Sequence, residues 1–261
     1  MIGDRPILPL GSVVPGESFT ALLDAHGLSP AWRTAAGAER LDPPEATTVL
    51  AFRYGDGVLM AGDRRATAGN LIAHRNVQKV FLADRFSAVA ISGTAGIAIE
   101  LIRLFQTELE HYEKLEGNRL SLEGKANYLA RMVRGQMPLA FQGLVVIPLF
   151  CGYDEDAERG RLFSFDVVGG RYEETDYAVT GSGGRDAKLY LRTAFRDDLT
   201  ADEAVHLSVE ALVAAAEEDT ATGGPDLQRG IYPNVVLVSS DGYREIPEDQ
   251  VAAVAREVVG Q

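Results

Sequence analysis

Three side chains that follow one another at equal spacing could carry out acyl-transfer chemistry. Thr47 in "EATTVLAF" is followed sixteen residues later by Asp63 in "AGDRRAT", and sixteen residues after that by Lys79 in "VQKVF". Each lies on or at the end of a segment with strand-like composition, so neighbouring strands could bring the three together. A threonine hydroxyl is a weak nucleophile, and it needs an adjacent base to attack a carbonyl.

The base could be the α-amine of Thr47 itself, if the chain were cut in front of this residue. An α-amine has a reference pKa of about 7.7–8.0, much closer to neutrality than the value of about 10.4 for lysine. Lys79 would then tune the site or relay a proton, and Asp63 would hold the lysine. The segment "SGTAG" at 92–96 offers backbone N–H groups where a strand meets a helix, a typical setting for an oxyanion hole.

The same residues also have a purely structural explanation. Asp63 could pair with Arg64 in a turn, and Lys79 could be a solvated strand residue. Thr47 could simply favour β structure. Spacing alone leaves both explanations open.

Composition and charge exclude several classes of function. The chain has 261 residues, of which 46% are hydrophobic and 24% charged, as in ordinary globular proteins. Its net charge of −13 argues against a nucleic-acid partner. No apolar run reaches the ~18–20 residues that a membrane span needs, and the N-terminus does not resemble a secretory signal. One cysteine excludes an intramolecular disulfide and fits a reducing cytosol, so we expect a cytoplasmic protein with Cys151 buried.

The chain divides into two parts of unequal character at Thr47. Six of its eleven prolines fall within the first 46 residues, where only "ESFTALLDAHGL" looks helical. From Thr47 onward, strand-like and helix-like segments follow one another. Strands are predicted over 47–54, 57–65, 79–83, 86–92, 144–154, 160–166, 176–182 and 232–242, and helices over 93–115, 121–137 and 200–218.

Local signals support this order of elements. "GDG" at 55–57 is a hairpin turn signal, and Thr200 with Glu203 forms a capping-box pattern. Hairpin-linked strands imply mainly antiparallel sheets whose outer faces are covered by helices. The pattern therefore predicts an α+β fold in which two sheets pack together between outer helices.

Beyond these patterns, the stretch at 47–81, "TTVLAFRYGDGVLMAGDRRATAGNLIAHRNVQKVF", resembles the N-terminal signature of proteasome β subunits, which are N-terminal threonine peptidases. The resemblance continues through "SGTAG", "GSGG" and "DTATGGPDLQRGIYPNVVLV", almost to the end of the chain. "HYEKLEG" and "TATGGPDLQRGI" resemble the actinobacterial branch of this family. The resemblance to proteasome β subunits implies the four-layer αββα sandwich of N-terminal nucleophile hydrolases, with a peptidase domain over 47–261 and a propeptide over 1–46.

The resemblance also implies roles for individual residues. Thr47 matches the nucleophile, Asp63 and Lys79 match its catalytic partners, and Gly93 matches the oxyanion donor. Three more positions match the group around the terminal amine: Ser182, Asp219 and Thr222, the last where many relatives carry serine. The substrate pocket corresponds to Ala66, Thr67, Val77, Ile91 and Ala95. Four of these five are apolar, which predicts cleavage after apolar residues, although apolar strand residues are also typical of a core.

One departure concerns the cleavage site between Ala46 and Thr47. Relatives usually carry glycine immediately before the threonine, at the position of Ala46. Glycine best tolerates a sharply bent backbone. Ala46 therefore keeps open an alternative in which the chain is a non-catalytic or processing-stalled ring scaffold. A second alternative is the simpler two-ring bacterial threonine peptidase, against which the long N-terminal segment and "HYEKLEG" argue.

The resemblance further implies a set of partners. It predicts a homo-oligomer of seven-membered β rings, two of them stacked, closed by rings of proteasome α subunits. A ring-shaped ATPase or activator would feed unfolded protein substrates, and no metal or cofactor would take part.

Overall fold

The computed structural model describes residues 47–69 and 71–260. These residues belong to one compact unit. The predicted helix in "ESFTALLDAHGL" and the residue Ala46 lie outside the described residues.

Two five-stranded antiparallel sheets form the centre of this unit. The first contains, in spatial order, β10 (Tyr177–Gly181), β1 (Thr48–Tyr54), β2 (Gly57–Gly62), β11 (Asn234–Ser239) and β12 (Gly242–Glu245). The second contains β5 (Val80–Asp84), β6 (Ser87–Gly93), β7 (Val146–Asp154), β8 (Arg159–Phe165) and β9 (Arg171–Glu174). A separate hairpin pairs β3 (Ala66–Ala68) with β4 (Leu71–His74).

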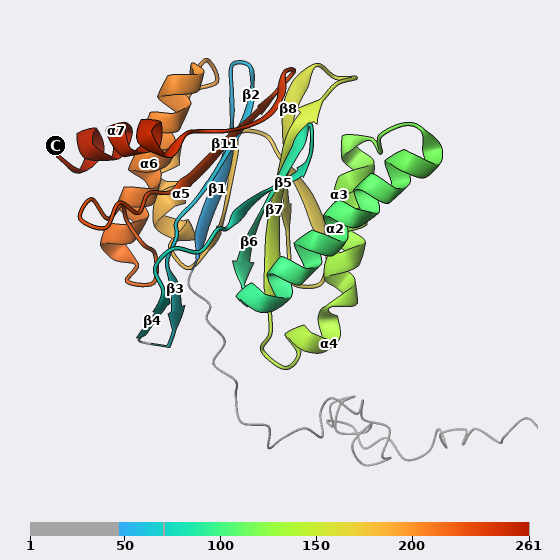
Figure 1. The fold of residues 1–261 in the computed structure, drawn as a ribbon, viewed down its shortest axis with the longest axis horizontal. Coiled ribbons are helices and arrows are strands. Elements are labelled where there is room, and N and C mark those ends of the chain that lie inside the picture. Colours follow the sequence, from blue (N-terminus) through green and yellow to red (C-terminus); the bar gives the residue numbers. More distant parts are fainter. Residues whose placement is uncertain (1–46, 70, 261) are drawn as a thin grey trace, which may run out of the picture. The chain divides into compact units, whose positions relative to one another are not determined.

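Helices cover the outer face of each sheet, which gives four layers (Figure 1). The first sheet is covered by α5 (Gly184–Ala194), α6 (Ala201–Glu218) and α7 (Glu248–Val259). The second is covered by α2 (Ala95–Glu116) and α3 (Leu122–Gly135), followed by the short α4 (Met137–Ala140). The predicted α+β architecture with two mainly antiparallel sheets between helices is confirmed.

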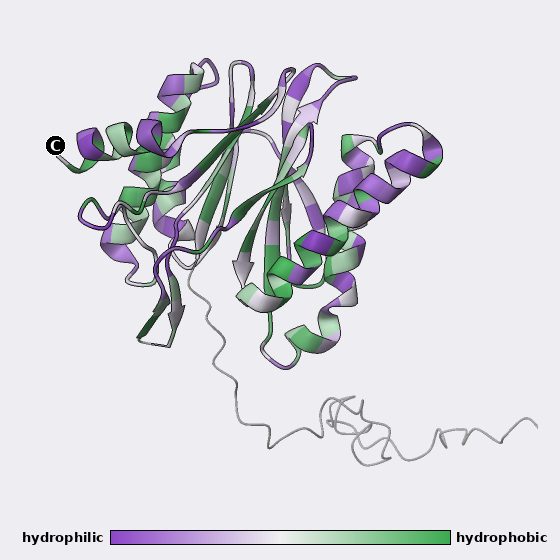
Figure 2. Ribbon diagram, viewed as in Figure 1, coloured by the Kyte–Doolittle hydropathy of each residue, from purple (hydrophilic) through white to green (hydrophobic). Residues whose placement is uncertain are grey.

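Three apolar layers hold the sandwich together, and the hydropathy of the strands reflects them (Figure 2). In β1, Leu50 and Phe52 face the helical layer of α5, α6 and α7, whereas Val49 and Ala51 face the second sheet. A strand buried on both faces needs a continuous apolar run rather than an alternating one, which explains "TVLAF". Cys151 is buried, as expected, and lies between the sheets, where burial raises the pKa of its thiol.

Most predicted element boundaries agree with the structure. Gly55 and Asp56 form the turn between β1 and β2. The capping box of α6 is present, with the Glu203 carboxylate accepting from the Thr200 N–H at 2.8 Å. The helix predicted over 121–137 is shorter than expected: α3 ends at Gly135, and Met137 starts α4. Pro138 accounts for this break, since it has no N–H to donate to the Arg134 carbonyl and its ring would collide with that carbonyl in a continuous helix.

Besides the short α4, six elements were not predicted from the sequence: β3, β4, β9, β12, α5 and α7. The strands of the β3–β4 hairpin are short and largely exposed, and β9 and β12 are short, mainly polar edge strands. Such edges carry little hydrophobic pattern. Helix α7 buries only Val251, Ala252 and Ala255, so its apolar stripe is small.

Candidate active site

Antiparallel pairing places the ends of several strands at one end of the sandwich. Val49 pairs with Gly62, so the start of β1 lies beside the end of β2, and the Asp63 N–H donates to the Thr48 carbonyl at 3.0 Å. Thr48 pairs with Gly181 on the other side. The register of β1 therefore brings together segments that lie more than a hundred residues apart in the sequence.

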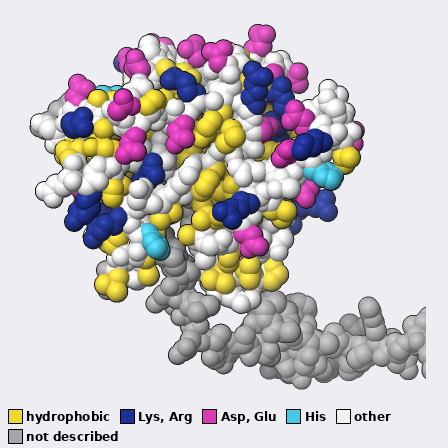
Figure 3. Space-filling view, viewed as in Figure 1, with side chains coloured by type: hydrophobic (Ala, Val, Ile, Leu, Met, Phe, Trp, Pro, Cys, Tyr) yellow, Lys and Arg dark blue, Asp and Glu magenta, His cyan; other side chains and the backbone are white. Residues whose placement is uncertain are grey.

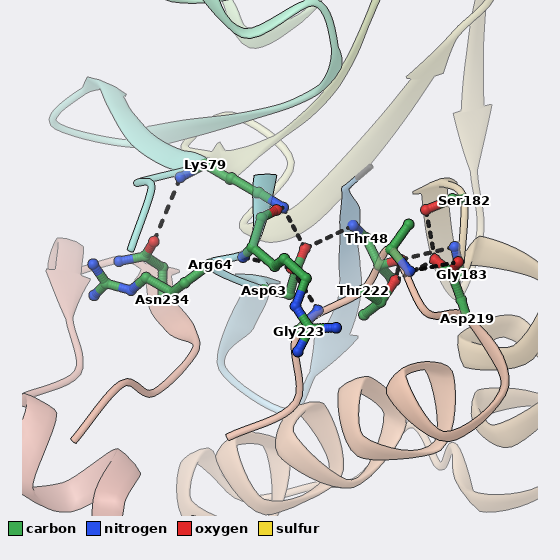
Figure 4. Close-up of polar contacts among 12 residues, drawn as sticks. Thr48, Asp63, Arg64, Lys79, Ser182, Gly183, Asp219, Thr222, Gly223 and Asn234 are labelled. Atoms are coloured by element: carbon green, nitrogen blue, oxygen red, sulfur yellow. Dashed lines mark hydrogen bonds and ion pairs between the residues drawn. The ribbon is translucent and has the colours of Figure 1, made fainter. Parts of the chain in front are cut away.

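Asp63 is fully buried at this point and accepts four hydrogen bonds. Its Oδ1 accepts from the Thr48 N–H at 2.8 Å and from the Lys79 Nζ at 2.5 Å. Its Oδ2 accepts from the backbone N–H of Arg65 at 2.8 Å and of Gly223 at 2.9 Å. Figure 4 shows the carboxylate between Lys79 and Thr48. Four donors in different directions fix the orientation of a buried carboxylate.

Lys79 is 2% exposed and lies directly before β5. Besides the pair with Asp63, its ammonium donates to the Arg65 carbonyl at 2.5 Å. Its backbone N–H donates to the Asn234 side-chain oxygen at 3.4 Å. Burial lowers the pKa of Lys79 below the usual lysine value, and the neighbouring Asp63 carboxylate opposes this shift without cancelling it. The structural alternative of a solvated lysine is wrong.

Thr47 is 6% exposed. Its backbone carbonyl accepts a hydrogen bond from the segment that follows β10. The Ser182 N–H donates to this carbonyl at 2.9 Å. The preceding residue, Gly181, has φ of +102°, and a Cβ at this position would lie 1.7 Å from the Thr47 oxygen. Only glycine allows this close approach. Sequence analysis missed Gly181, although the "GSGG" run marks it.

Ser182, Asp219 and Thr222 form a second polar cluster, and the structure brings all three together. The hydroxyls of Ser182 and Thr222 donate to the Asp219 Oδ2 at 2.5 and 2.6 Å. Partial burial raises the pKa of Asp219, but these hydrogen bonds outweigh burial and hold it below the ordinary aspartate value.

Thr48 connects the two clusters, and sequence analysis assigned it no role. Its hydroxyl lies 2.6 Å from the Thr222 hydroxyl and accepts from the Gly183 N–H at 3.0 Å. A hydroxyl has a single proton, and that of Thr222 goes to Asp219. Thr48 must therefore donate to Thr222. The result is a directed chain from Gly183 through Thr48 and Thr222 to the Asp219 carboxylate (Figure 4).

Gly93 ends β6 with φ of +99°, where a Cβ would lie 2.1 Å from the Val145 carbonyl. The next N–H, from Thr94, donates to that carbonyl at 2.8 Å. Of the N–H groups predicted to be available in "SGTAG", the one on Thr94 is therefore already engaged.

Four of the five positions matched to the substrate pocket lie on three elements, and the fifth, Val77, lies between β4 and β5. Ala66 and Thr67 lie on β3 and are buried, Ile91 lies on β6, and Ala95 begins α2. Val77 is half-buried and donates its N–H to the Arg64 carbonyl at 2.9 Å. Ile91 is 4% exposed and packs in the apolar layer beneath α2 and α3, so it contributes to the core in addition to any contact with a substrate.

Residues 47–69 and 71–260 give no indication of two further classes of function. This part of the chain contains no group of three or more His, Cys, Asp or Glu side chains arranged to hold a metal ion. It contains no helix long and apolar enough to cross a membrane.

Comparison with known proteins identifies the class to which this fold and site belong. The family model for "Proteasome subunit" matches residues 44–226. The chain is 52% identical over 244 residues to "Proteasome subunit beta" of Acidimicrobium ferrooxidans, covering 94% of this chain and 89% of that protein. It is 51% identical over 261 residues to the protein of the same name from Stackebrandtia nassauensis, covering 97% and 92%. With that of Acidothermus cellulolyticus it shares 54% identity over 228 residues, covering 86% and 79%.

The chain belongs to the proteasome subunit family, as a β subunit of the proteasome core with a protease role. The four layers are accordingly the N-terminal nucleophile hydrolase sandwich, and the protein assembles into a multi-subunit particle.

Proposed function

We propose that the chain is the precursor of a threonine endopeptidase whose nucleophile is Thr47. The observation that carries this proposal is the buried Asp63–Lys79 pair, which is joined through Asp63 to the backbone N–H that follows Thr47. A buried ion pair is a costly feature that a fold retains where it needs a fixed charge. Here the fixed charge lies beside a threonine at the start of a strand.

The first chemical step follows from cleavage of the peptide bond between Ala46 and Thr47. The freed α-amine accepts the proton of the Thr47 hydroxyl while the oxygen attacks the substrate carbonyl. The buried ammonium of Lys79 lowers the cost of negative charge on the attacking oxygen. The Gly93 N–H stabilises the tetrahedral oxyanion.

The second half of the reaction returns the enzyme to its starting state. The α-ammonium gives its proton to the departing amine, and the C–N bond breaks to leave an ester on Thr47. Water, deprotonated by the same amine, attacks this ester and releases the acid product with regeneration of the hydroxyl. Ser182, Asp219 and Thr222 orient the α-amine; the lowered pKa of Asp219 supports a carboxylate there at neutral pH.

The substrates are unfolded proteins, cut after apolar residues. Ala66, Thr67, Val77, Ile91 and Ala95 form the pocket for the residue before the cut. Small and apolar side chains at these positions favour an apolar occupant.

Assembly is part of the proposed function. Residues 1–46 form a propeptide that keeps the amine of Thr47 blocked, and residues 47–261 form the mature subunit. Seven copies make a ring, two β rings stack, and rings of α subunits close each end. A ring-shaped ATPase or activator delivers substrates to this particle in the cytoplasm.

One sequence feature favours the alternative of a silent scaffold, namely Ala46 in place of the usual glycine. A methyl group at this position restricts the backbone during self-cleavage. A subunit that is never cut would assemble but would not hydrolyse peptides.

Intact-mass spectrometry of the chain, after assembly with its α partner, tests both possibilities. The matched variants are Thr47→Ala and Ala46→Gly, and a fluorogenic peptide that ends in an apolar residue reports turnover. We expect the mass of residues 47–261 together with turnover, and neither in Thr47→Ala. Uncut wild-type rings without turnover would support the scaffold, and recovery in Ala46→Gly would identify a stalled protease.

A further inference from the structure

An open groove of about 660 Å³ borders the proposed catalytic centre. Gly93 and Ser182 are among its lining residues, and its walls come from the ends of β6 and β10, the start of β7 with the residue before it, and the start of α5. None of its lining residues was assigned to substrate binding from the sequence. These two residues connect the groove to the proposed centre: Ser182 donates to the Thr47 carbonyl, and Gly93 is the proposed oxyanion donor.

The groove lies on the opposite side of Gly93 from the proposed pocket for the residue before the cut. In the second sheet, β5 pairs with one edge of β6 and β7 with the other. Val77 and Ala66 lie on the β5 side, near Lys79, whereas the groove lies on the β7 side, at Val145 and Ile147. A peptide with its carbonyl at Gly93 and its N-terminal part on the β5 side must continue toward the groove.

The charged side chains that line the groove are both cationic, Arg185 and Lys188. They stand three residues apart on α5 and therefore share one face of the helix. Both are exposed, and neither forms a hydrogen bond or ion pair with another described residue. Asp186 lies between them in sequence but does not line the groove. Two unpaired cations are notable in a chain whose net charge is −13.

We propose that this groove binds the substrate segment that follows the cleaved bond, and that Arg185 and Lys188 select acidic side chains there. The inference rests on the proposed peptidase function and adds a specificity on the leaving side of the cut. An aspartate or glutamate that enters the groove forms exposed ion pairs with the two cations. Two such pairs favour an acidic over a neutral isosteric segment by about fivefold in kcat/KM at low salt.

The test compares two internally quenched peptides on the assembled particle. Both carry leucine before the cut, and the next two residues are Asp-Glu in one and Asn-Gln in the other. A third peptide carries aminocoumarin directly after leucine and so has no residues beyond the cut. Mass spectrometry verifies the cleaved bond. We expect wild type to prefer the acidic peptide about fivefold, and this preference to weaken as the salt concentration rises.

Variants assign the preference to the groove. The double variant Arg185→Gln/Lys188→Gln should lose it, and the charge-conserving Arg185→Lys/Lys188→Arg should retain it. Arg192→Gln, an exposed change further along α5, is the matched control and should behave as wild type. Equal kcat/KM for both peptides in wild type, or a preference that survives the double Gln change, would overturn the groove assignment. Failure to cleave even the aminocoumarin peptide would instead overturn the peptidase function, and the groove's role with it.

Discussion

At the scale of single residues, the hydroxyl of Thr48 is the part of the site that links its two halves. This hydroxyl accepts from the Gly183 N–H and donates to the Thr222 hydroxyl. The backbone N–H of the same residue, Thr48, donates to the Asp63 carboxylate. Thr48 is fully buried, so none of these partners can turn to water in its absence. A residue that never touches substrate can therefore determine how accurately Thr47 is positioned.

Replacement of this hydroxyl by a methyl group should be costly. We expect Thr48→Val to lower the free energy of unfolding by about 1–3 kcal/mol, because the Gly183 N–H loses its acceptor while buried. Peptide turnover should fall as well. Urea unfolding and steady-state kinetics measure the two effects, and Thr48→Ser, which keeps the hydroxyl, should restore both. Equal loss in the serine variant would contradict a role for the hydroxyl.

Asp219 should make stability depend on acid pH. Its pKa is lowered in the folded state, so its contribution is fully present above the unfolded value of about 3.9. That contribution is lost as the pH falls from this value through the lower folded one. Removal of one donor in Ser182→Ala should shrink the pH-dependent part. The urea midpoint of wild type and of Ser182→Ala, measured between pH 2 and pH 6, reports this pH dependence. The same decrease of the midpoint with falling pH in both proteins would refute the contribution of Asp219.

At the scale of elements, the junction between β10 and β1 positions Thr47, the proposed nucleophile. The two strands approach so closely at Gly181 and Thr47 that no side chain fits between them. The same junction leads directly into α5, through the Ser182 and Gly183 N–H groups that bind Thr47 and Thr48. The pairing of β1 with β10 and the start of α5 therefore depend on the same three residues, 181–183.

Gly181→Ala tests this coupling. A Cβ would collide with the Thr47 carbonyl, and the positive φ adds about 1–2 kcal/mol for a residue that is not glycine. We expect a marked loss of thermal stability and of turnover. Gly135→Ala is the matched control: it ends α3, no atom lies within 4 Å of the new methyl group, and φ is not positive there. Wild-type behaviour of both variants would show that the junction tolerates a wider spacing.

At the scale of the whole molecule, membership of a multi-subunit particle requires surfaces that other subunits cover. Apolar side chains gather at two places at the lower end of the described unit in Figure 3, one of them where the β3–β4 hairpin projects in Figure 1. Leu71 on this hairpin is 75% exposed and its neighbour Ile72 38%. Exposed apolar side chains of this size on a projecting hairpin are typical of subunit contacts.

Leu71→Ser should therefore weaken assembly without changing the subunit itself. Burial of a leucine contributes about 1.5–3 kcal/mol, so each contact should weaken by roughly tenfold or more. Native mass spectrometry over a dilution series measures the assembled fraction, and urea unfolding of the free subunit should be unchanged. Val259→Ser at the end of α7 is a comparable exposed control. An unaltered assembled fraction in Leu71→Ser would exclude the hairpin from the interface.

The sequence alone determined the architecture, because its long elements carry strong periodic patterns. The apolar stripe of α2, the capping box of α6 and the turn after β1 each act over a few residues, so they can be read locally. The resemblance to proteasome β subunits also indicated Asp63 and Lys79, and the structure joins these two directly.

Only the tertiary structure decided what surrounds that pair. The link from Thr48 to Thr222 spans 174 residues, and that from Asp63 to Gly223 spans 160. Gly181 shows its importance only when the Thr47 carbonyl lies against it, and Arg185 and Lys188 are ordinary helix residues until β6 and β7 form the other wall of their groove. Such features arise from the packing of distant strands, which no local pattern of side chains encodes.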